Sequence, residues 1–144
     1  MIIMENVYND VMEKCAISHI ETGGILGGKN DIIFKFEFDK GTNLSSVQHY
    51  YPNIEGLNAC LENWLIENID FYGIVHSHIH KLRDLSSNDI QYIQTIMNAM
   101  PEKIQLLFFP IVLPGKEMLS FKAIRQNNKI NIVTDDIKIY KREW

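Results

Sequence analysis

Two histidines separated by a single residue, and an aspartate eleven positions after the second of them, are the side chains in this sequence best suited to chemistry. They are His76, His78 and Asp89. If both histidines lie at the end of a strand, their imidazoles project from the same face, because side chains two residues apart share a face. Three protein ligands of this kind, with a fourth position left to water, are typical of a catalytic zinc site. Zinc lowers the pKa of its bound water to roughly 7, so such a site supplies hydroxide at neutral pH.

Each part of this group also has an ordinary structural explanation. Histidines at strand ends often belong to the core or the surface with their hydrogen bonds satisfied, and Ser86 followed by Asp89 fits the capping box of a helix start. Together the parts favour a metal site, because the strand, the helix and the ligand spacing are inferred from different residues and agree. Capping by Ser86 is compatible with metal ligation by Asp89.

The strand that carries the histidines is predicted from residues 71–77, FYGIVHS, a nearly continuous apolar run of the kind found in strands buried on both faces. A helix over residues 86–101 is predicted by its serine caps and by its terminal proline. Four apolar residues share one face of this helix: Ile90, Ile93, Met97 and Met100. The polar connection at residues 78–85 lets the first helical turn return over the strand end, with Asp89 beside the imidazoles.

The first part of the chain predicts a helix followed by a hairpin. Residues 4–18 carry apolar side chains on one four-residue row, which predicts an amphipathic helix that stops near His19. Residues 21–28 and 31–38 predict two strands, and the chain is expected to turn between them at residues 28–30.

The rest of the chain predicts a loop, a second helix and further strands. Residues 39–53 have no regular period and are rich in turn formers, which predicts an exposed loop. A core-facing helix is predicted by apolar residues at helical spacing: Ile54, Leu57, Leu61, Trp64, Leu65 and Ile69. Further strands are expected at residues 104–113, 118–124, 129–133 and 137–140. Pro110 favours an edge position or a bulge in the first of these strands.

The composition is that of an ordinary soluble domain. The 144 residues are 46% hydrophobic and 22% charged, enough for one domain with its own core. A net charge of -4 with scattered Lys and Arg argues against nucleic acid as a partner. Cys15 and Cys60 are too few for a disulfide framework and are expected to be small buried hydrophobes in a reducing cytoplasm. No signal peptide or membrane-spanning segment is expected.

The string HSHIHKLRDLSSND resembles the signature of the JAMM (MPN-plus) zinc metalloproteases: His, Ser or Thr, His, seven residues, Ser, two residues, Asp. In that family a glutamate precedes a Gly-Gly strand, and ETGGILGG is similar to the prokaryotic JAB version, with Glu21 at the matching position. The order of helices and strands follows that family over most of the chain. The resemblance implies an α/β fold over residues 1–144: a single-domain three-layer α-β sandwich of the JAB/MPN type, cytidine-deaminase-like, with a mixed β-sheet and about three helices.

The same resemblance implies a site and a substrate. One Zn²⁺ per chain would be held by His76, His78 and Asp89, with Glu21 as general base and Ser86 as a hydrogen-bond donor to the oxyanion. The implied substrate is a ubiquitin-like protein or its conjugate, cut after the C-terminal glycine at a peptide or isopeptide bond. An extended tail can pair with a strand edge, and glycines pass through a narrow slot. The loop with His49, Tyr50 and Tyr51 could form a wall of that slot or pack in the core.

The sequence departs from the family pattern after the second histidine. Ile79 and His80 stand where family members have proline, and no proline precedes Ser86. His80 is expected to be a loop residue on the substrate side, or plainly exposed. Two rival functions remain: a non-haem iron enzyme with a two-His-one-carboxylate triad, and a catalytically silent MPN-fold scaffold or ubiquitin-like binding module. The sequence leaves the substrate's identity, the pathway and the oligomeric state open.

Overall fold

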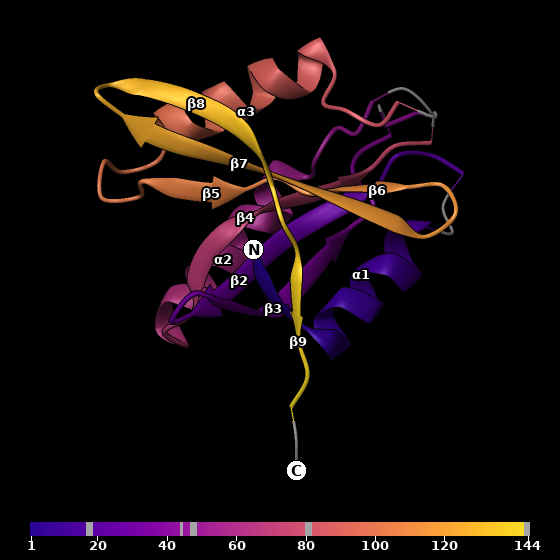
Figure 1. The fold of residues 1–144 in the computed structure, drawn as a ribbon, viewed down its shortest axis with the longest axis horizontal. Coiled ribbons are helices and arrows are strands. Elements are labelled where there is room, and N and C mark those ends of the chain that lie inside the picture. Colours follow the sequence, from indigo (N-terminus) through magenta and orange to yellow (C-terminus); the bar gives the residue numbers. More distant parts are fainter. Residues whose placement is uncertain (17–18, 44, 47–48, 80–81, 143–144) are drawn as a thin grey trace.

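The computed structural model describes residues 1–16, 19–43, 45–46, 49–79 and 82–142 (Figure 1). It has three helices: α1 (Glu5–Ala16), α2 (Ile54–Ile66) and α3 (Ser87–Ala99). Its nine strands are β1 (Ile2–Met4), β2 (Gly23–Lys29), β3 (Ile32–Asp39), β4 (Asp70–Ser77), β5 (Leu106–Phe108), β6 (Ile111–Leu113), β7 (Glu117–Gln126), β8 (Lys129–Asp135) and β9 (Lys138–Tyr140).

All nine strands form one mixed sheet, with β4 near its centre. On one side β4 pairs antiparallel with β2, which continues through β3 and β1 to β9. On the other side β4 pairs parallel with β5 and β6, and β7 then joins them to β8. The histidine strand is therefore central, with a neighbour on each side to fix its position.

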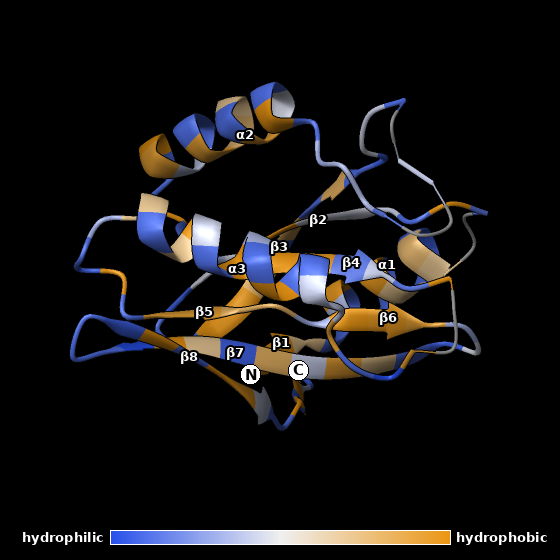
Figure 2. Cartoon of the chain, turned by 90° about the horizontal axis from the view of Figure 1, so that it is seen from above, coloured by the Kyte–Doolittle hydropathy of each residue, from blue (hydrophilic) through white to orange (hydrophobic). Residues whose placement is uncertain are grey.

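Helices cover both faces of the sheet and make three layers. On β2 and β4, Ile25 and Ile74 belong to the core beneath α2 and α3, whereas Leu26 and Val75 belong to the core beneath α1. Figure 2 shows α2 and α3 with polar and apolar residues alternating around each helix, as helices that cover one face of a sheet require. The predicted α/β fold with a mixed sheet and about three helices is confirmed.

The first hairpin is confirmed, but its predicted turn is wrong by about two residues. β2 continues to Lys29, which pairs with Ile32, and the turn is made by Asn30 and Asp31. Both turn residues have positive φ, 52° and 67°, the geometry of a type I′ turn that suits the twist of a tight hairpin. The glycine pair suggested an earlier turn, but Asn and Asp can also adopt this conformation.

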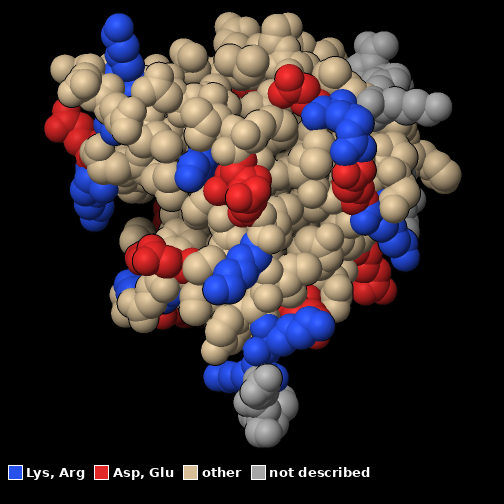
Figure 3. Space-filling model, in the orientation of Figure 1, with Lys and Arg blue, Asp and Glu red and all other residues tan. Residues whose placement is uncertain are grey.

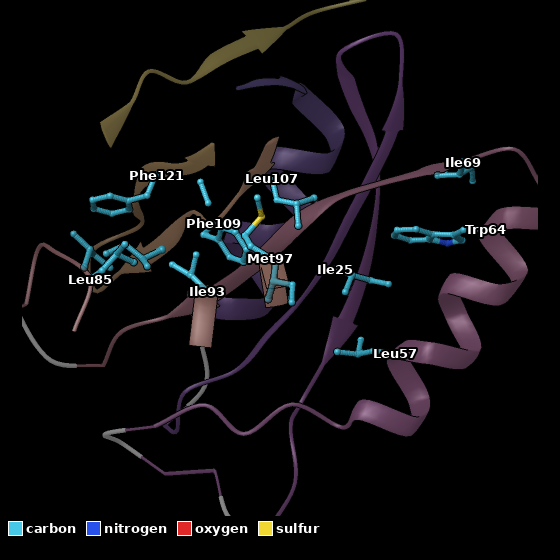
Figure 4. Close-up of a cluster of buried hydrophobic side chains, with 14 residues drawn as sticks. Ile25, Leu57, Trp64, Ile69, Leu85, Ile93, Met97, Leu107, Phe109 and Phe121 are labelled. Carbon is cyan, nitrogen blue, oxygen red and sulfur yellow. The ribbon is translucent and has the colours of Figure 1, made fainter. Parts of the chain in front are cut away.

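The second helix is shorter than predicted and buries fewer of its apolar residues. Asn53 caps its start by accepting a hydrogen bond from Gly56, and the helix ends before Ile69. Leu57 and Trp64 are buried, as predicted, but Ile54 and Leu65 are exposed. In Figure 4, Trp64 and Leu57 project from α2 toward the core.

Pro110 interrupts the strand predicted over residues 104–113, which the structure resolves as β5 and β6. Of the two predicted alternatives, an edge position is wrong, because β5 and β6 both lie between β4 and β7; in place of a bulge, the strand is interrupted at Pro110. The carbonyl of Pro110 accepts a hydrogen bond from the His76 backbone at 3.2 Å, so the break faces the histidines. The sequence interpretation missed β1, a strand of three residues.

The surface and the cysteines add little to the site. Figure 3 shows Lys and Arg interspersed with Asp and Glu on the face that it draws. Cys15 is buried, as predicted, and Cys60 is partly buried. No helix of the described residues has the length and apolar character needed to cross a membrane.

Candidate metal centre

The two histidines lie on the α3 side of the sheet at the end of β4. His76 pairs with Gly23 on β2 and with Ile111 on β6. The pairing continues one step past the strand, because the N–H of His78 donates to the Val112 carbonyl at 2.8 Å. Both histidines are therefore held by backbone bonds, and both are largely buried, with 9% and 5% of their surface exposed.

The histidine rings and the Asp89 carboxylate converge on one point. The Nε2 atoms of His76 and His78 are 3.0 Å apart. Asp89 Oδ1 lies 3.2 Å from Nε2 of His76, and Oδ2 lies 2.9 Å from Nε2 of His78. One donor atom from each residue falls within 4.8 Å of the others, which is a group that could bind a metal ion. Two imidazole nitrogens and one carboxylate that converge in this way, all largely shielded from solvent, are a donor set that suits a divalent ion.

A backbone contact orients one of these rings. Nδ1 of His78 lies 3.2 Å from the Leu82 carbonyl oxygen, and a carbonyl can only accept. Nδ1 therefore carries a proton, and Nε2 is the nitrogen directed at the group. Metal-ligating histidines commonly have such a second partner, which fixes the tautomer and the ring orientation.

The carboxylate of Asp89 is also the cap of α3. Ser86 Oγ accepts the Asp89 N–H at 3.1 Å, and Asp89 Oδ2 accepts the Ser86 N–H at 2.9 Å. Burial would raise the pKa of Asp89, but hydrogen bonds from His76 and His78 hold it well below its usual range. The carboxylate is therefore ionised and fixed in place, and the serine hydroxyl hydrogen is not used by the cap.

Asp89 also affects the pKa of His78. Burial alone would lower the pKa of His78, but the hydrogen bond to Asp89 and the bond to the Leu82 carbonyl raise it overall. Without a metal the group is a charge-assisted cluster. A metal ion would take the place of the proton between these atoms.

Glu21 lies just before β2, two residues ahead of its first residue, Gly23. Thr22 and Ser77 lock the two strands together: Ser77 N donates to the Thr22 carbonyl at 2.7 Å, and Thr22 N donates to Ser77 Oγ at 2.9 Å. The antiparallel register from Gly23 opposite His76 then places Glu21 opposite His78, on the same face. Ser77, between the two histidines, thus joins the strand of the histidines to that of the glutamate.

The Glu21 carboxyl is buried, with only 4% of the residue exposed. Burial raises its pKa to about 7; the neighbouring charge of His78 and a hydrogen bond from the Tyr50 backbone act in the opposite direction. A carboxyl with a pKa near neutrality is suited to accept and return a proton.

Tyr50 connects the loop after β3 to the metal group. Its ring lies nearly parallel to that of His76, with planes 10° apart and centroids 6.3 Å apart. Its hydroxyl donates to Asp39 at 2.5 Å, and Asp39 also accepts from the Asn53 backbone. A Cβ at Gly23 would lie 2.9 Å from the Tyr50 ring, so glycine makes room for this packing. Burial and this hydrogen bond to Asp39 raise the pKa of Tyr50 above its ordinary value.

A groove of about 370 Å³ opens beside the metal group. Strand β4 and Phe109 form its floor, the loop at residues 49–52 forms one wall, and α3 forms the other. His76 and Asp89 line one end of it. The predicted wall residues His49, Tyr50 and Tyr51 all border this groove. In Figure 4, Ile93 and Phe109, which also line it, lie side by side.

The structure brings together His76, His78 and Asp89, places Glu21 beside them, and places Ser86 against Asp89. The roles of these residues remain predictions. His80 lies outside the described residues. The supporting roles of Tyr50, Asp39 and the Leu82 carbonyl were not found in the sequence, since each depends on contacts between distant segments.

Comparison with solved structures supports the fold. A protein from Desulfitobacterium hafniense superposes with a TM-score of 0.73 over 99% of this chain and 94% of its own, at 14% identity. A protein from Salinibacter ruber gives 0.60 over 97% and 92%, at 12% identity. A JAB1/MPN domain protein from Archaeoglobus fulgidus gives 0.56 over 97% of both chains, at 15% identity. Scans of the sequence against protein-family models and against curated proteins give no match.

The protein is thus an α/β protein with a fold similar to that of JAB1/MPN domains. It carries a His-His-Asp group that could bind a metal ion at the end of its central strand. These features are compatible with a hydrolase.

Proposed function

We propose that the protein is a zinc-dependent peptidase or isopeptidase that acts after the C-terminal glycine of a ubiquitin-like protein. The observation that carries this proposal is a buried carboxyl with a pKa of about 7, Glu21, beside a three-donor metal group. A structural site would have no use for an additional buried acid of this kind. The resemblance of the sequence to the JAMM signature and the JAB1/MPN-like fold support it.

The chain's residues have separable tasks in this reaction. His76, His78 and Asp89 would hold Zn²⁺, which when bound polarises the scissile carbonyl and activates water. Glu21 would accept the proton of the attacking water and deliver it to the leaving amine. The hydroxyl of Ser86 would donate to the oxygen on which charge develops.

Replacing Glu21 should lower the cleavage rate without lowering the zinc content. Glu21→Gln should retain zinc and lose roughly 10²- to 10⁴-fold in cleavage rate, the scale of general acid-base catalysis. The measurements are zinc by elemental analysis and cleavage of a ubiquitin-like fusion from the same genome. Glu102→Gln, which changes an exposed glutamate, is the matched control and should cleave at the parent rate. Full activity in Glu21→Gln would remove Glu21 as the base, and loss of zinc would make it a ligand.

The rival functions give different results in the same experiment. An iron enzyme would purify with iron and would lose it in His76→Ala and His78→Ala. A silent scaffold would bind the ubiquitin-like protein without cleaving it, with or without metal. Zinc that remains bound in His76→Ala, His78→Ala and Asp89→Ala would contradict the ligand assignment itself.

A further inference from the structure

Strand β8 (Lys129–Asp135) lies at an edge of the sheet. Within the described residues it pairs with β7 alone, and Figure 1 shows it as an outer strand beside α3. Edge strands in natural proteins are commonly protected by a proline, a bulge or lysines along the edge. The sequence of β8 is KINIVTD: its single lysine is its first residue, it has no proline, and its register with β7 has no shift. The outer edge of β8 is therefore open to pairing with another strand.

The register with β7 identifies the backbone groups that β8 directs outward. On β7 the N–H of Arg125 donates to the Gln105 carbonyl at 2.8 Å, in the direction away from β8. Its partner on β8, Ile130, therefore belongs to a pair that is not hydrogen-bonded. Because bonded and non-bonded pairs alternate along an antiparallel ladder, Ile130, Ile132 and Thr134 all direct their N–H and C=O groups outward.

These three outward residues are complementary to themselves. In an antiparallel self-pair centred on Ile132, this residue faces Ile132 of a second copy, and Ile130 faces Thr134 of that copy. Outward groups then meet only outward groups, which gives about six hydrogen bonds between the copies. A shift by one residue would set them against groups already bonded to β7. The centred register also brings Lys129 of each copy opposite Asp135 of the other, so that opposite charges face each other.

The helix beside β8 has an apolar side chain at the same edge. A groove of about 350 Å³ lies between α3 and β8, and Ile90, Gln94, Ile130 and Ile132 are among its lining residues. Ile90 is 41% exposed. Neighbouring strands lie about 4.8 Å apart and α3 packs on both β7 and β8, so a sheet continued through β8 would bring the α3 helices of two copies to about 10 Å. Helices pack at about 8–10 Å, so Ile90 would be buried by the second copy.

We propose that the protein forms a two-fold symmetric dimer in which β8 pairs antiparallel with β8 of a second copy. The two sheets become one continuous sheet, and the α3 helices pack against each other across the new pair of strands. Each copy contributes the same edge, so the interface is closed and adds no third copy. The inference is independent of the proposed function, because neither the metal group nor Glu21 takes part in the interface.

Sedimentation of the full chain over a series of concentrations tests the dimer. We expect the mass to rise from that of one chain, 16.8 kDa, to twice that value. Thr134→Pro removes an outward N–H and leaves the bonds to β7 in place, so it should fold and should raise the dimer Kd at least tenfold. A parent protein that stays monomeric, or a Thr134→Pro variant that dimerises like the parent, would overturn the proposal.

The residue that faces itself tests the register. Ile132→Lys and Ile132→Glu each place like charges on the two-fold axis, so each variant alone should be monomeric. An equimolar mixture should dimerise with one copy of each, because the charges are then opposite, and native mass spectrometry resolves this species. Homodimers of either variant, or a mixture of folded variants that stays monomeric, would contradict the pairing. Because Thr134 is exposed, Thr134→Pro carries the test if circular dichroism shows that a charge at Ile132 prevents folding.

A lysine on another exposed apolar surface is the matched control. Leu65 on α2 is 79% exposed, and Leu65→Lys adds the same charge as Ile132→Lys at a position away from β8. This variant should dimerise with the Kd of the parent protein. Loss of the dimer in Leu65→Lys, with the dimer retained in Ile132→Lys, would place the interface at α2 and overturn the proposal.

Discussion

At the scale of single residues, the site depends on two carboxyls in opposite states. Asp89 is ionised because hydrogen bonds to two histidines outweigh its burial, whereas the burial of Glu21 dominates and raises its pKa to about 7. Pairs of acids whose environments separate their pKa values are a recurring basis for assigning acid-base roles. Asp89 is therefore suited to hold a cation, and Glu21 is suited to exchange protons.

The raised pKa of Glu21 predicts a pH-dependent stability cost in the metal-free protein. Between its ordinary pKa of 4.5 and about 7, the folded state binds more protons at Glu21 than the unfolded state, so stability falls as pH rises through this window. Glu21→Gln, which never ionises, should therefore be more stable than the parent at pH 8, by on the order of 3 kcal/mol. The difference should vanish below pH 4.5. Urea unfolding at both pH values measures it, and a constant difference would mean that burial does not perturb Glu21.

Ser86 should show two separable effects, because it caps α3 and is also the proposed oxyanion donor. Ser86→Ala should lose about 1 kcal/mol from the lost cap and on the order of a hundredfold in rate. Ser86→Asp restores a capping side chain but offers no hydroxyl proton, so it should recover stability without recovering rate. Thermal melts and cleavage rates measure the two effects. Cleavage at the parent rate by Ser86→Ala would leave capping as its only role.

At the scale of elements, the described part of the connection between β4 and α3 carries an exposed ion pair to β7. Arg83 makes a two-pronged ion pair with Glu117, the first residue of β7, with N–O distances of 2.5 and 2.6 Å. Arg83 follows Leu82, whose carbonyl accepts the His78 Nδ1–H. The pair thus holds the carbonyl that orients a predicted metal ligand.

Breaking this pair should weaken metal binding slightly. Arg83→Glu and Glu117→Arg should each reduce zinc affinity roughly 2- to 5-fold, since exposed ion pairs are weak. The double variant, with the charges exchanged, should recover the parent affinity. A competition assay with a chromophoric chelator measures the affinities. Equal loss in the singles and the double would show that the pair does not position Leu82.

The elements also show which features of the fold could be predicted from the sequence. Periodicity predicted α1, α3 and β4, because a buried stripe or a buried run leaves a direct trace in the residue types. It overestimated the core-facing side of α2, because Ile54 and Leu65 are apolar but exposed, at 55% and 79%. The three candidate ligands were found because they are close in sequence. Tyr50 and Asp39 support the site through contacts that form only after the loop folds back, which no local pattern records.

At the scale of the whole molecule, a metal bound at the end of the central strand should stabilise the entire fold. Its proposed ligands come from β4 and α3, so it joins the sheet to the helix layer. Zinc at a hundredfold excess over its Kd should add about 2.7 kcal/mol, which corresponds to roughly 8 °C in Tm for a domain of this size. A chelator should remove this gain, and Asp89→Ala should show none. An unchanged Tm on adding zinc to the metal-free protein would argue against the site.

The pairing of β1 with β9 bears on the order in which the chain folds. Residues 2–4 lie parallel to residues 138–140, so this contact joins segments that are far apart in the sequence. The β2–β3 and β7–β8 hairpins, by contrast, bring together neighbouring segments. Local hairpins close within microseconds, whereas distant pairings must first overcome the entropy of loop closure. We expect β9 to dock after the rest of the sheet and, in the native state, to detach before it, with its amides exchanging hydrogen faster than those of β4.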